Sequence, residues 1–245
     1  MHSRATSLSL LIDNGISIFR ELTSAQIEIL KWMGVVAMIL DHVGLIFYPD
    51  NINFRIAGRI AYPIFGFVLI HNYIYFTKNK LWYIKRLFFL ALATEPFHML
   101  LFWKYSVGIN VFFMYSLVLA SVYILEGHCK TIENSSFKKT LIAFIFALFM
   151  VASSFIGYFI VGYLLILSFY FSFKDSSGLS FMATLILLTA LTYPVPYYVL
   201  GTLATLPVIF LVSKFNIPPI PRIKIIFYMF YPVHVCVILL LKPIG

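Results

Sequence analysis

Long apolar stretches follow one another along almost the whole chain, and short segments between them hold most of the charges. Crossing about 30 Å of hydrocarbon takes roughly 20 apolar residues, with about 17 as a lower limit. The pattern predicts nine membrane-spanning helices, at residues 32–48, 59–77, 82–102, 109–126, 140–155, 157–173, 179–194, 196–213 and 223–241. We divide the uncharged stretch from Thr140 to Phe173 at Gly157 because it is too long for one ordinary span, and eight or ten spans remain open.

The composition agrees with this pattern, since 62% of the residues are hydrophobic and only 11% are charged. An average soluble domain is about 25% charged. The predicted fold is therefore all-α, a polytopic bundle of transmembrane helices. Residues 1–30 lack the basic start, apolar stretch and small-residue cleavage site of a secretory signal, so we expect a cytoplasmic or interfacial segment there and a membrane domain over residues 31–245.

Lys and Arg are distributed unequally between alternate loops, which predicts the orientation of the chain because cytoplasmic loops retain basic residues. With the N-terminus inside, the outer segments hold only Arg55, Arg59, Lys104 and Lys242. The inner segments hold fourteen: Arg4, Arg20, Lys31, Lys78, Lys80, Lys85, Arg86, Lys130, Lys138, Lys139, Lys174, Lys214, Arg222 and Lys224. We therefore predict a cytoplasmic N-terminus and an external C-terminus.

The net charge of +9 follows from this topology, so it does not indicate a nucleic-acid partner. Nucleic-acid binding needs basic residues clustered on one folded face. The two cysteines, Cys129 and Cys236, match no metal or redox spacing, and we expect no metal site. The sequence also lacks a glycine-rich phosphate loop and a nucleophile elbow.

Six polar residues lie in the outer parts of four consecutive predicted spans. An ionisable group deep in a span costs about 2.5–3.5 kcal/mol on insertion scales, so its presence indicates a functional site by default. The six are Asp41, His42, Arg59, Glu95, His98 and Asn110. We predict that they border one outward-facing cavity. The structural alternatives are an Asp41 that pairs with an arginine and an Arg59 that extends toward the interface.

A second set of polar residues lies elsewhere in the spans. His71 lies in the inner half of the second span, and Arg86 enters the third span after a basic loop. His234 follows Pro232 in the last span. The loop is basic enough to attract phosphates, although positive-inside topology explains its lysines equally well. A single histidine in a membrane helix also serves often in packing.

Five motifs occur in order: Asp41-His42-Val43-Gly44, Gly58 through Phe65, Arg86 through Phe97, Asn110 through Phe113, and Tyr231-Pro232-Val233-His234. As an ordered set they resemble the TraX family of conjugative plasmids, the F-type pilin N-acetyltransferases. The resemblance implies acetylation of the N-terminal alanine of the pilin subunit in the bacterial inner membrane, with acetyl-CoA as donor. The expected partners are pilin and membrane lipids, and residues 31–245 would form the acetyltransferase domain.

Acetyl transfer requires a base for the amine and donors for the oxyanion. We assign the base to His42, oriented by Asp41 or Glu95, because an imidazole titrates near neutral pH. Arg59 and Asn110 are the candidate oxyanion donors. Arg86, with its basic loop, is the candidate for the CoA phosphates, and His71 and His234 join it as candidate cofactor-binding residues.

Two other functions share these polar residues. A small-molecule transporter with an outward polar cavity predicts substrate flux and no modified product. A non-catalytic pilin assembly factor predicts changed pilin level or insertion with an unmodified N-terminus.

Replacing His42 tests the assignment of the base. We expect His42→Ala to leave pilin unacetylated, because the acceptor amine would keep its proton. The intact mass of pilin made with this variant measures the outcome, and fully acetylated pilin would rule out the role.

Overall fold

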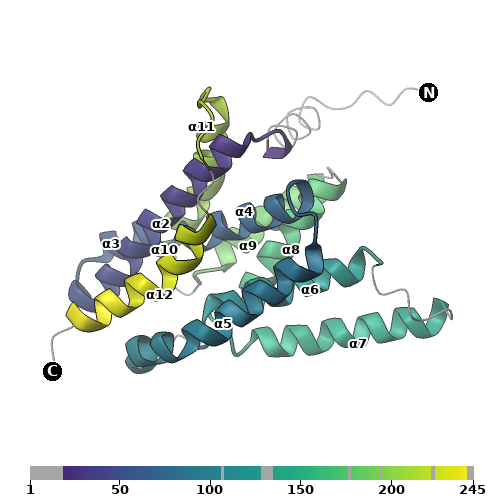
Figure 1. Cartoon of the computed structure of the whole chain (residues 1–245), viewed down its shortest axis with the longest axis horizontal. Helices are drawn as coiled ribbons and strands as arrows, with labels where there is room; N and C mark the ends of the chain where they lie inside the picture. The colour runs from purple at the N-terminus through teal and green to yellow at the C-terminus, as the bar shows by residue number, and fades with distance from the viewer. Residues whose placement is uncertain are drawn as a thin grey trace. The chain divides into compact units, whose positions relative to one another are not determined.

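The regular structure of the described residues is helical, as predicted, apart from one isolated bridge between Ile109 and Ile156. The computed structural model describes residues 19–105, 108–127, 135–175, 178–193, 195–221 and 224–241 (Figure 1). The α-helices are α2 (Ser24–Phe47), α3 (Ile52–Gly58), α4 (Ala61–Tyr75), α5 (Lys80–Phe102), α6 (Val111–Leu125), α7 (Ser135–Ser153), α8 (Phe159–Asp175), α9 (Gly178–Ala190), α10 (Pro196–Leu203), α11 (Thr205–Lys214) and α12 (Lys224–Leu241). A 3₁₀ helix, η1 (Trp103–Tyr105), follows α5.

Three helical stretches of the described residues are long and apolar enough to cross a membrane, namely Ser24–Phe47, Ile52–Tyr75 and Pro196–Lys214. Shorter apolar helices lie at Val111–Leu125, Lys139–Ser153, Phe159–Lys174, Gly178–Ala190 and Phe227–Leu241. Each predicted span thus coincides with a helix or a broken helix. These helices indicate a membrane protein, and the number of spans and the orientation stay predictions.

Proline accounts for two breaks inside predicted spans. Pro63 and Pro207 have no N–H to donate to the carbonyl four residues earlier, so a helix cannot continue unchanged through them. Each lies in the first turn of a new helix, Pro63 in α4 and Pro207 in α11. The predicted spans 59–77 and 196–213 are therefore joined to short helices, α3 before the first and α10 within the second.

The predicted division at Gly157 is confirmed. Helix α7 ends at Ser153 and α8 begins at Phe159. Tyr158 and Phe159 both have positive φ, 69° and 50°, which L-residues rarely adopt. The chain reverses through this conformation between the two helices.

Helix α2 begins earlier than its predicted span because a capping box fixes its start. Thr23 Oγ1 accepts from the Gln26 backbone N–H at 3.2 Å, and Gln26 Oε1 accepts from the Thr23 N–H at 2.8 Å. This pairing satisfies backbone donors that a helix N-terminus leaves open. Residues 1–18 of the predicted N-terminal segment lie outside the described residues.

The chain divides into two compact units, and the boundaries fall inside α4 and α8. Unit 1 comprises Met1–His71 and Leu165–Arg222, and unit 2 comprises Asn72–Leu164 and Ile223–Gly245. The prediction of one catalytic domain over residues 31–245 stays a prediction.

In unit 1, helices α2 and α3 form a tight hairpin because glycines replace side chains where the backbones meet. A Cβ at position 58 would lie 2.6 Å from Asp41 Cα, and a Cβ at position 44 would overlap Phe54 Cβ. At the far end of α2, the side-chain amide of Gln26 donates to the carbonyls of Ser213 and Phe215, both at 3.1 Å. Small residues and polar bonds of this kind commonly hold membrane helices together.

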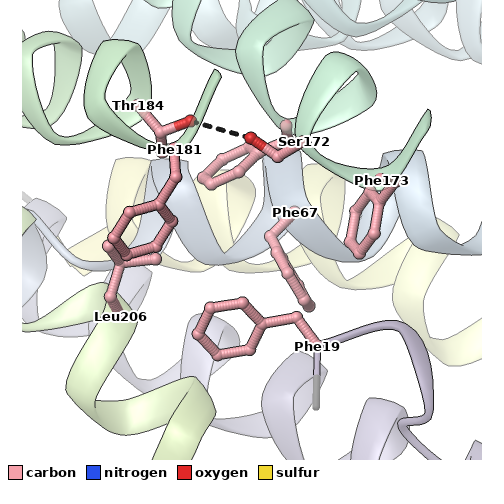
Figure 2. Close-up of a pocket in the computed structure, with 8 residues that line it drawn as sticks. Phe19, Phe67, Ser172, Phe173, Phe181, Thr184 and Leu206 are labelled. Carbon is pink, nitrogen blue, oxygen red and sulfur yellow. Dashed lines mark hydrogen bonds between the residues drawn. The ribbon is translucent and has the colours of Figure 1, made fainter. Parts of the chain in front are cut away.

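An aromatic cluster fills the core of unit 1 around Phe67. Its ring lies 5.6 Å from Phe169 and 5.2 Å from Phe173, measured between centroids. Figure 2 shows the pocket that remains, of about 20 Å³. It is lined by Phe19, Phe67, Phe169, Ser172, Phe173, Phe181, Thr184 and Leu206. This volume holds about one water molecule and no substrate.

In unit 2, helices α5, α6 and α7 lie side by side (Figure 1). Helix α6 runs antiparallel to α5, because Lys80 at the start of α5 pairs with Glu126 just after α6, at 2.6 Å. The Tyr73 hydroxyl donates to the same carboxylate oxygen at 3.2 Å. Ser121 on α6 and Tyr163 on α8 share a hydrogen bond of 2.7 Å.

The contact of Gly58 with α2 gives a stability prediction. Gly58→Ala adds a carbon where Asp41 already lies, so we expect destabilisation by about 1–3 kcal/mol. Thermal unfolding in detergent measures it. Ala57→Leu, at the exposed neighbouring position, is the control and should leave the melting temperature nearly unchanged. An unchanged melting temperature for Gly58→Ala would contradict the close contact.

Candidate active site

Asp41 lies between two arginines within unit 1. Its carboxylate is 3.0 Å from Arg55 Nη1 and 3.5 Å from Arg59 Nη2. Arg55 Nη1 also donates to the backbone carbonyl of Asp41 at 3.1 Å. All three side chains are largely buried, at 12–14% exposure. A buried carboxylate is stable only with such partners, so Asp41 acts in this state as the centre of an ion-pair network.

Helix α10 completes this network. The Tyr198 ring lies 4.9 Å from the Arg59 guanidinium and 5.9 Å from that of Arg55. Gly201, one turn later, has no side chain because a Cβ there would overlap the Ile56 carbonyl of α3. The close approach of α10 to α3 therefore brings the tyrosine over both cations.

His42 is half-buried on α2, next to Asp41. Adjacent helical residues point about 100° apart. The Asp41 carboxylate faces the two arginines. The role of His42 stays a prediction.

Unit 2 contains a second polar cluster, centred on Asn110. This residue is fully buried and forms the N-cap of α6, where its Oδ1 accepts from the Phe112 N–H at 2.9 Å. Its Nδ2 donates to Glu95 Oε2 at 2.6 Å and to the Ala91 carbonyl at 2.8 Å. Its backbone N–H donates to the same Glu95 oxygen at 2.9 Å. Asn110 thus holds one oxygen of Glu95 with two donors.

The other oxygen of Glu95 faces His98. Oε1 lies 3.9 Å from His98 Nδ1, which is too long for a hydrogen bond. Both atoms are buried, and neither has a hydrogen-bond partner in the described part of the chain. An unsatisfied buried acceptor costs about 1–3 kcal/mol, more when it is charged. Glu95 Oε1 is therefore open to a hydrogen-bond donor.

The backbone around Asn110 is fixed by the bridge to the α7–α8 connection. The Ile109 N–H donates to the Phe155 carbonyl at 3.1 Å, and the Gly157 N–H donates to the Ile109 carbonyl at 3.2 Å. Gly108 has a φ of +77°, and a Cβ there would lie 2.9 Å from the Phe155 carbonyl. Glycine therefore permits the turn that presents Asn110 to Glu95.

Aromatic side chains of α12 adjoin this cluster. The Tyr231 ring packs edge-on against Phe112 at 5.0 Å and lies 5.3 Å from the His234 ring. His234 Nδ1 donates to the Phe230 carbonyl at 3.0 Å, one turn earlier on the same helix. In this state His234 serves helix α12, and its cofactor role stays a prediction.

Arg86 is held by two tyrosines. Its guanidinium carbon lies 4.5 Å from the Tyr228 ring and 5.4 Å from the Tyr83 ring. Its Nε is buried without a hydrogen-bond partner in the described ranges. Its side chain is also hydrogen-bonded to Tyr228, so part of its donor edge is already engaged, and its role toward a phosphate stays a prediction.

His71 lies in the aromatic cluster of unit 1. It is 1% exposed, and its ring is 6.2 Å from Phe67 and 5.7 Å from Phe173. A ligand could reach this imidazole only after the surrounding rings move. The geometry favours packing, the alternative already evident from the sequence.

The six predicted polar residues therefore fall into two groups. Asp41, His42 and Arg59 belong to unit 1, and Glu95, His98 and Asn110 belong to unit 2. That all six border one cavity stays a prediction. Arg55, Tyr198 and Tyr231 were not among the predicted site residues. The available signals were Arg55 lying four residues before Arg59, and Tyr231 opening the last motif.

Comparison with known proteins supplies the family. The model of the family described as TraX protein matches residues 26–242, which include every candidate residue of both clusters. A stretch of 46 residues is 46% identical to an uncharacterized protein of Rickettsia prowazekii (strain Madrid E). That match covers 19% of this chain and only 18% of the relative. No solved structure matches.

The family is linked to acetylation of F-plasmid pilin, so membership suggests a transferase role in the processing of conjugative pilin. Together with the long apolar helices, it indicates a membrane protein. Because the match extends over nearly the whole chain, the protein belongs to the TraX family.

Proposed function

We propose that this protein is a multi-pass N-acetyltransferase of the bacterial inner membrane that acetylates the N-terminal alanine of the F-type pilin subunit, with acetyl-CoA as donor. The observation that carries the proposal is the carboxylate of Glu95. One of its oxygens is held by Asn110, and the other is buried beside His98 without a hydrogen-bond partner in the described residues. Family membership supplies the substrate class.

The reaction requires a proton acceptor. The ammonium group of pilin loses a proton, and its nitrogen lone pair attacks the thioester carbonyl carbon. The attacking nitrogen gives up a second proton as the amide forms. The carbon–sulfur bond breaks, the sulfur leaves with the electron pair, and it takes up one proton to give the free thiol, so one of the two protons lost by nitrogen is released to solvent. A buried carboxylate and imidazole receive the amine proton and return it to the sulfur. We assign this task to the Glu95–His98 pair, whose facing atoms lie 3.9 Å apart, in place of the His42 expected from the sequence.

Asn110 is a positioning residue in this scheme. Its amide has two hydrogens, and these already meet Glu95, Ala91 and Thr94 as acceptors. It therefore has no hydrogen left to stabilise an oxyanion in the same state. Its effect is to fix Oε2, so that Oε1 keeps one direction toward His98.

The donor phosphates are the proposed ligands of Arg86. The predicted orientation places the loop before α5 in the cytoplasm, where acetyl-CoA is made, and the pilin N-terminus on the other side. Lys80 of that loop is already paired with Glu126. Arg86 carries its charge on a guanidinium stacked between tyrosines, which favours bidentate phosphate binding.

Co-expression tests the activity itself. We expect pilin made with this protein to gain one acetyl group at its N-terminal alanine, and pilin made without it to gain none. Intact-mass measurement with N-terminal peptide sequencing distinguishes the two. A changed pilin level with no acetyl increment would instead support an assembly factor, and flux of a small solute with unmodified pilin would support a transporter.

Replacing Glu95 tests the site. Glu95→Gln keeps an oxygen for Asn110 but loses the basic carboxylate, so we expect acetylation to slow by about 10²–10⁴-fold with little loss of folded protein. Timed mass measurement of pilin gives the rate. Glu126→Gln is the matched control, because it removes a carboxylate of the same unit outside the cluster.

A fully active Glu95→Gln enzyme would reject Glu95 as base and return the role to His42. Loss of activity in both Glu95→Gln and Glu126→Gln, with lowered melting temperatures, would show that buried charge sustains the fold and not the chemistry.

A further inference from the structure

A cavity of unit 2 lies outside the candidate active site. It has a volume of about 490 Å³, within the range of roughly 300–1,000 Å³ typical of small-molecule sites. Its walls come from α5, α6 and α7 with the connections beside them. The lining residues are Ile84, Lys85, Phe88, Phe89, Ile109, Phe113, Ser116, Leu117, Ala120, Ala152 and Ile156.

We propose that this cavity binds one acyl chain of an anionic phospholipid, with the lipid phosphate at Lys85. The lining is apolar except for Lys85 and Ser116. Phe88 and Phe89 are 43% and 61% exposed, so aromatic surface borders the cavity where a chain can enter. Lys85 is exposed and forms no salt bridge in the described part of the chain, so its charge is available to the phosphate.

The position and lining of the cavity favour an extended hydrocarbon chain. The lining follows α6 from Phe113 to Ala120, about 10 Å at the helical rise, and continues to Ile109 before the helix begins. Its residues are almost all apolar. A flexible acyl chain can lie along such a wall without the hydrogen-bond partners that a polar ligand would need.

The charge selects a phospholipid over a CoA thioester. A CoA molecule brings a diphosphate and a further phosphate, which call for several cations. The cavity offers one lysine, which matches the single negative charge of an anionic glycerophospholipid. Lys80, one turn before Lys85, is already paired with Glu126. One cation beside an apolar channel is the arrangement that a charged headgroup and its acyl chain require.

Native mass spectrometry of the full chain tests the proposal. The protein is exchanged into detergent with equal amounts of phosphatidylglycerol and phosphatidylethanolamine, and the retained lipids are counted. We expect one retained phosphatidylglycerol per chain. Lys85→Ala should weaken its retention about fivefold relative to phosphatidylethanolamine, the effect of one cation near an anionic lipid. Lys78→Ala, at an exposed position just before α5, should not.

A second test fills the cavity with a larger side chain. Ala120→Phe should abolish retention of both lipids, whereas Ala143→Phe, which adds the same bulk at an exposed position of α7, should retain them. Unchanged retention in Ala120→Phe would overturn the proposal. If acetyl-CoA displaced the lipid from the unchanged protein but not from Lys85→Ala, the cavity would be a site for acetyl-CoA, and the lipid proposal would be overturned. Neither readout requires acetylation, so failure of the proposed function leaves this test intact.

Discussion

A carboxylate buried in an apolar helical protein must be neutralised by its neighbours, and the two clusters meet this constraint differently. Two guanidinium groups surround Asp41, and they also join α2 to α3. Glu95 has only one oxygen bound by donors, and its other oxygen is buried next to His98. Removing a charge from water costs several kcal/mol unless partners replace the lost hydration. The first arrangement holds helices together through its two cations, although Asp41 Oδ1 lies 3.5 Å from Arg59 and also lacks a hydrogen bond within the described residues. In the second, the open oxygen faces an imidazole instead of a guanidinium, an arrangement common in active sites.

Much of the fold was predictable because a membrane helix needs a long apolar run, and such runs are visible in any sequence. The break at Gly157 followed from length alone. The breaks before α4 and α11 were not predicted, although Pro63 and Pro207 lie at them. A mean hydropathy over a window does not depend on whether a residue has a backbone N–H, so it does not reveal a break caused by proline. The division into two units was not predictable, since it depends on packing between segments that are distant in sequence.

The sequence predicted which residues belong to the candidate site, but not which of them contact one another. Polar residues inside apolar runs singled out Asp41 and Glu95, yet the sequence suggested that either could orient His42. The hairpin of α2 and α3 brings Arg55 and Arg59 to Asp41, and only a glycine at position 58 permits that approach. The spacing of residues in the sequence cannot show this close approach of α3 to α2. The same limit applies to Asn110. From the sequence it is a candidate donor to a substrate, but in the structure its two amide hydrogens already bond to acceptors around it.

Ile109 connects the proposed chemistry with the membrane. Its backbone pairs with the α7–α8 connection, its side chain lines the cavity of unit 2, and the next residue holds the Glu95 carboxylate. The hydrogen bonds on both sides of its peptide groups leave little freedom for the side chain to move alone. A chain that fills the cavity therefore supports Ile109, and an empty cavity leaves it without packing on one side. Since Asn110 holds the Glu95 carboxylate whose other oxygen lies 3.9 Å from His98 Nδ1, a shift of Asn110 would change that distance. The lipid and the base are thus linked through one short segment.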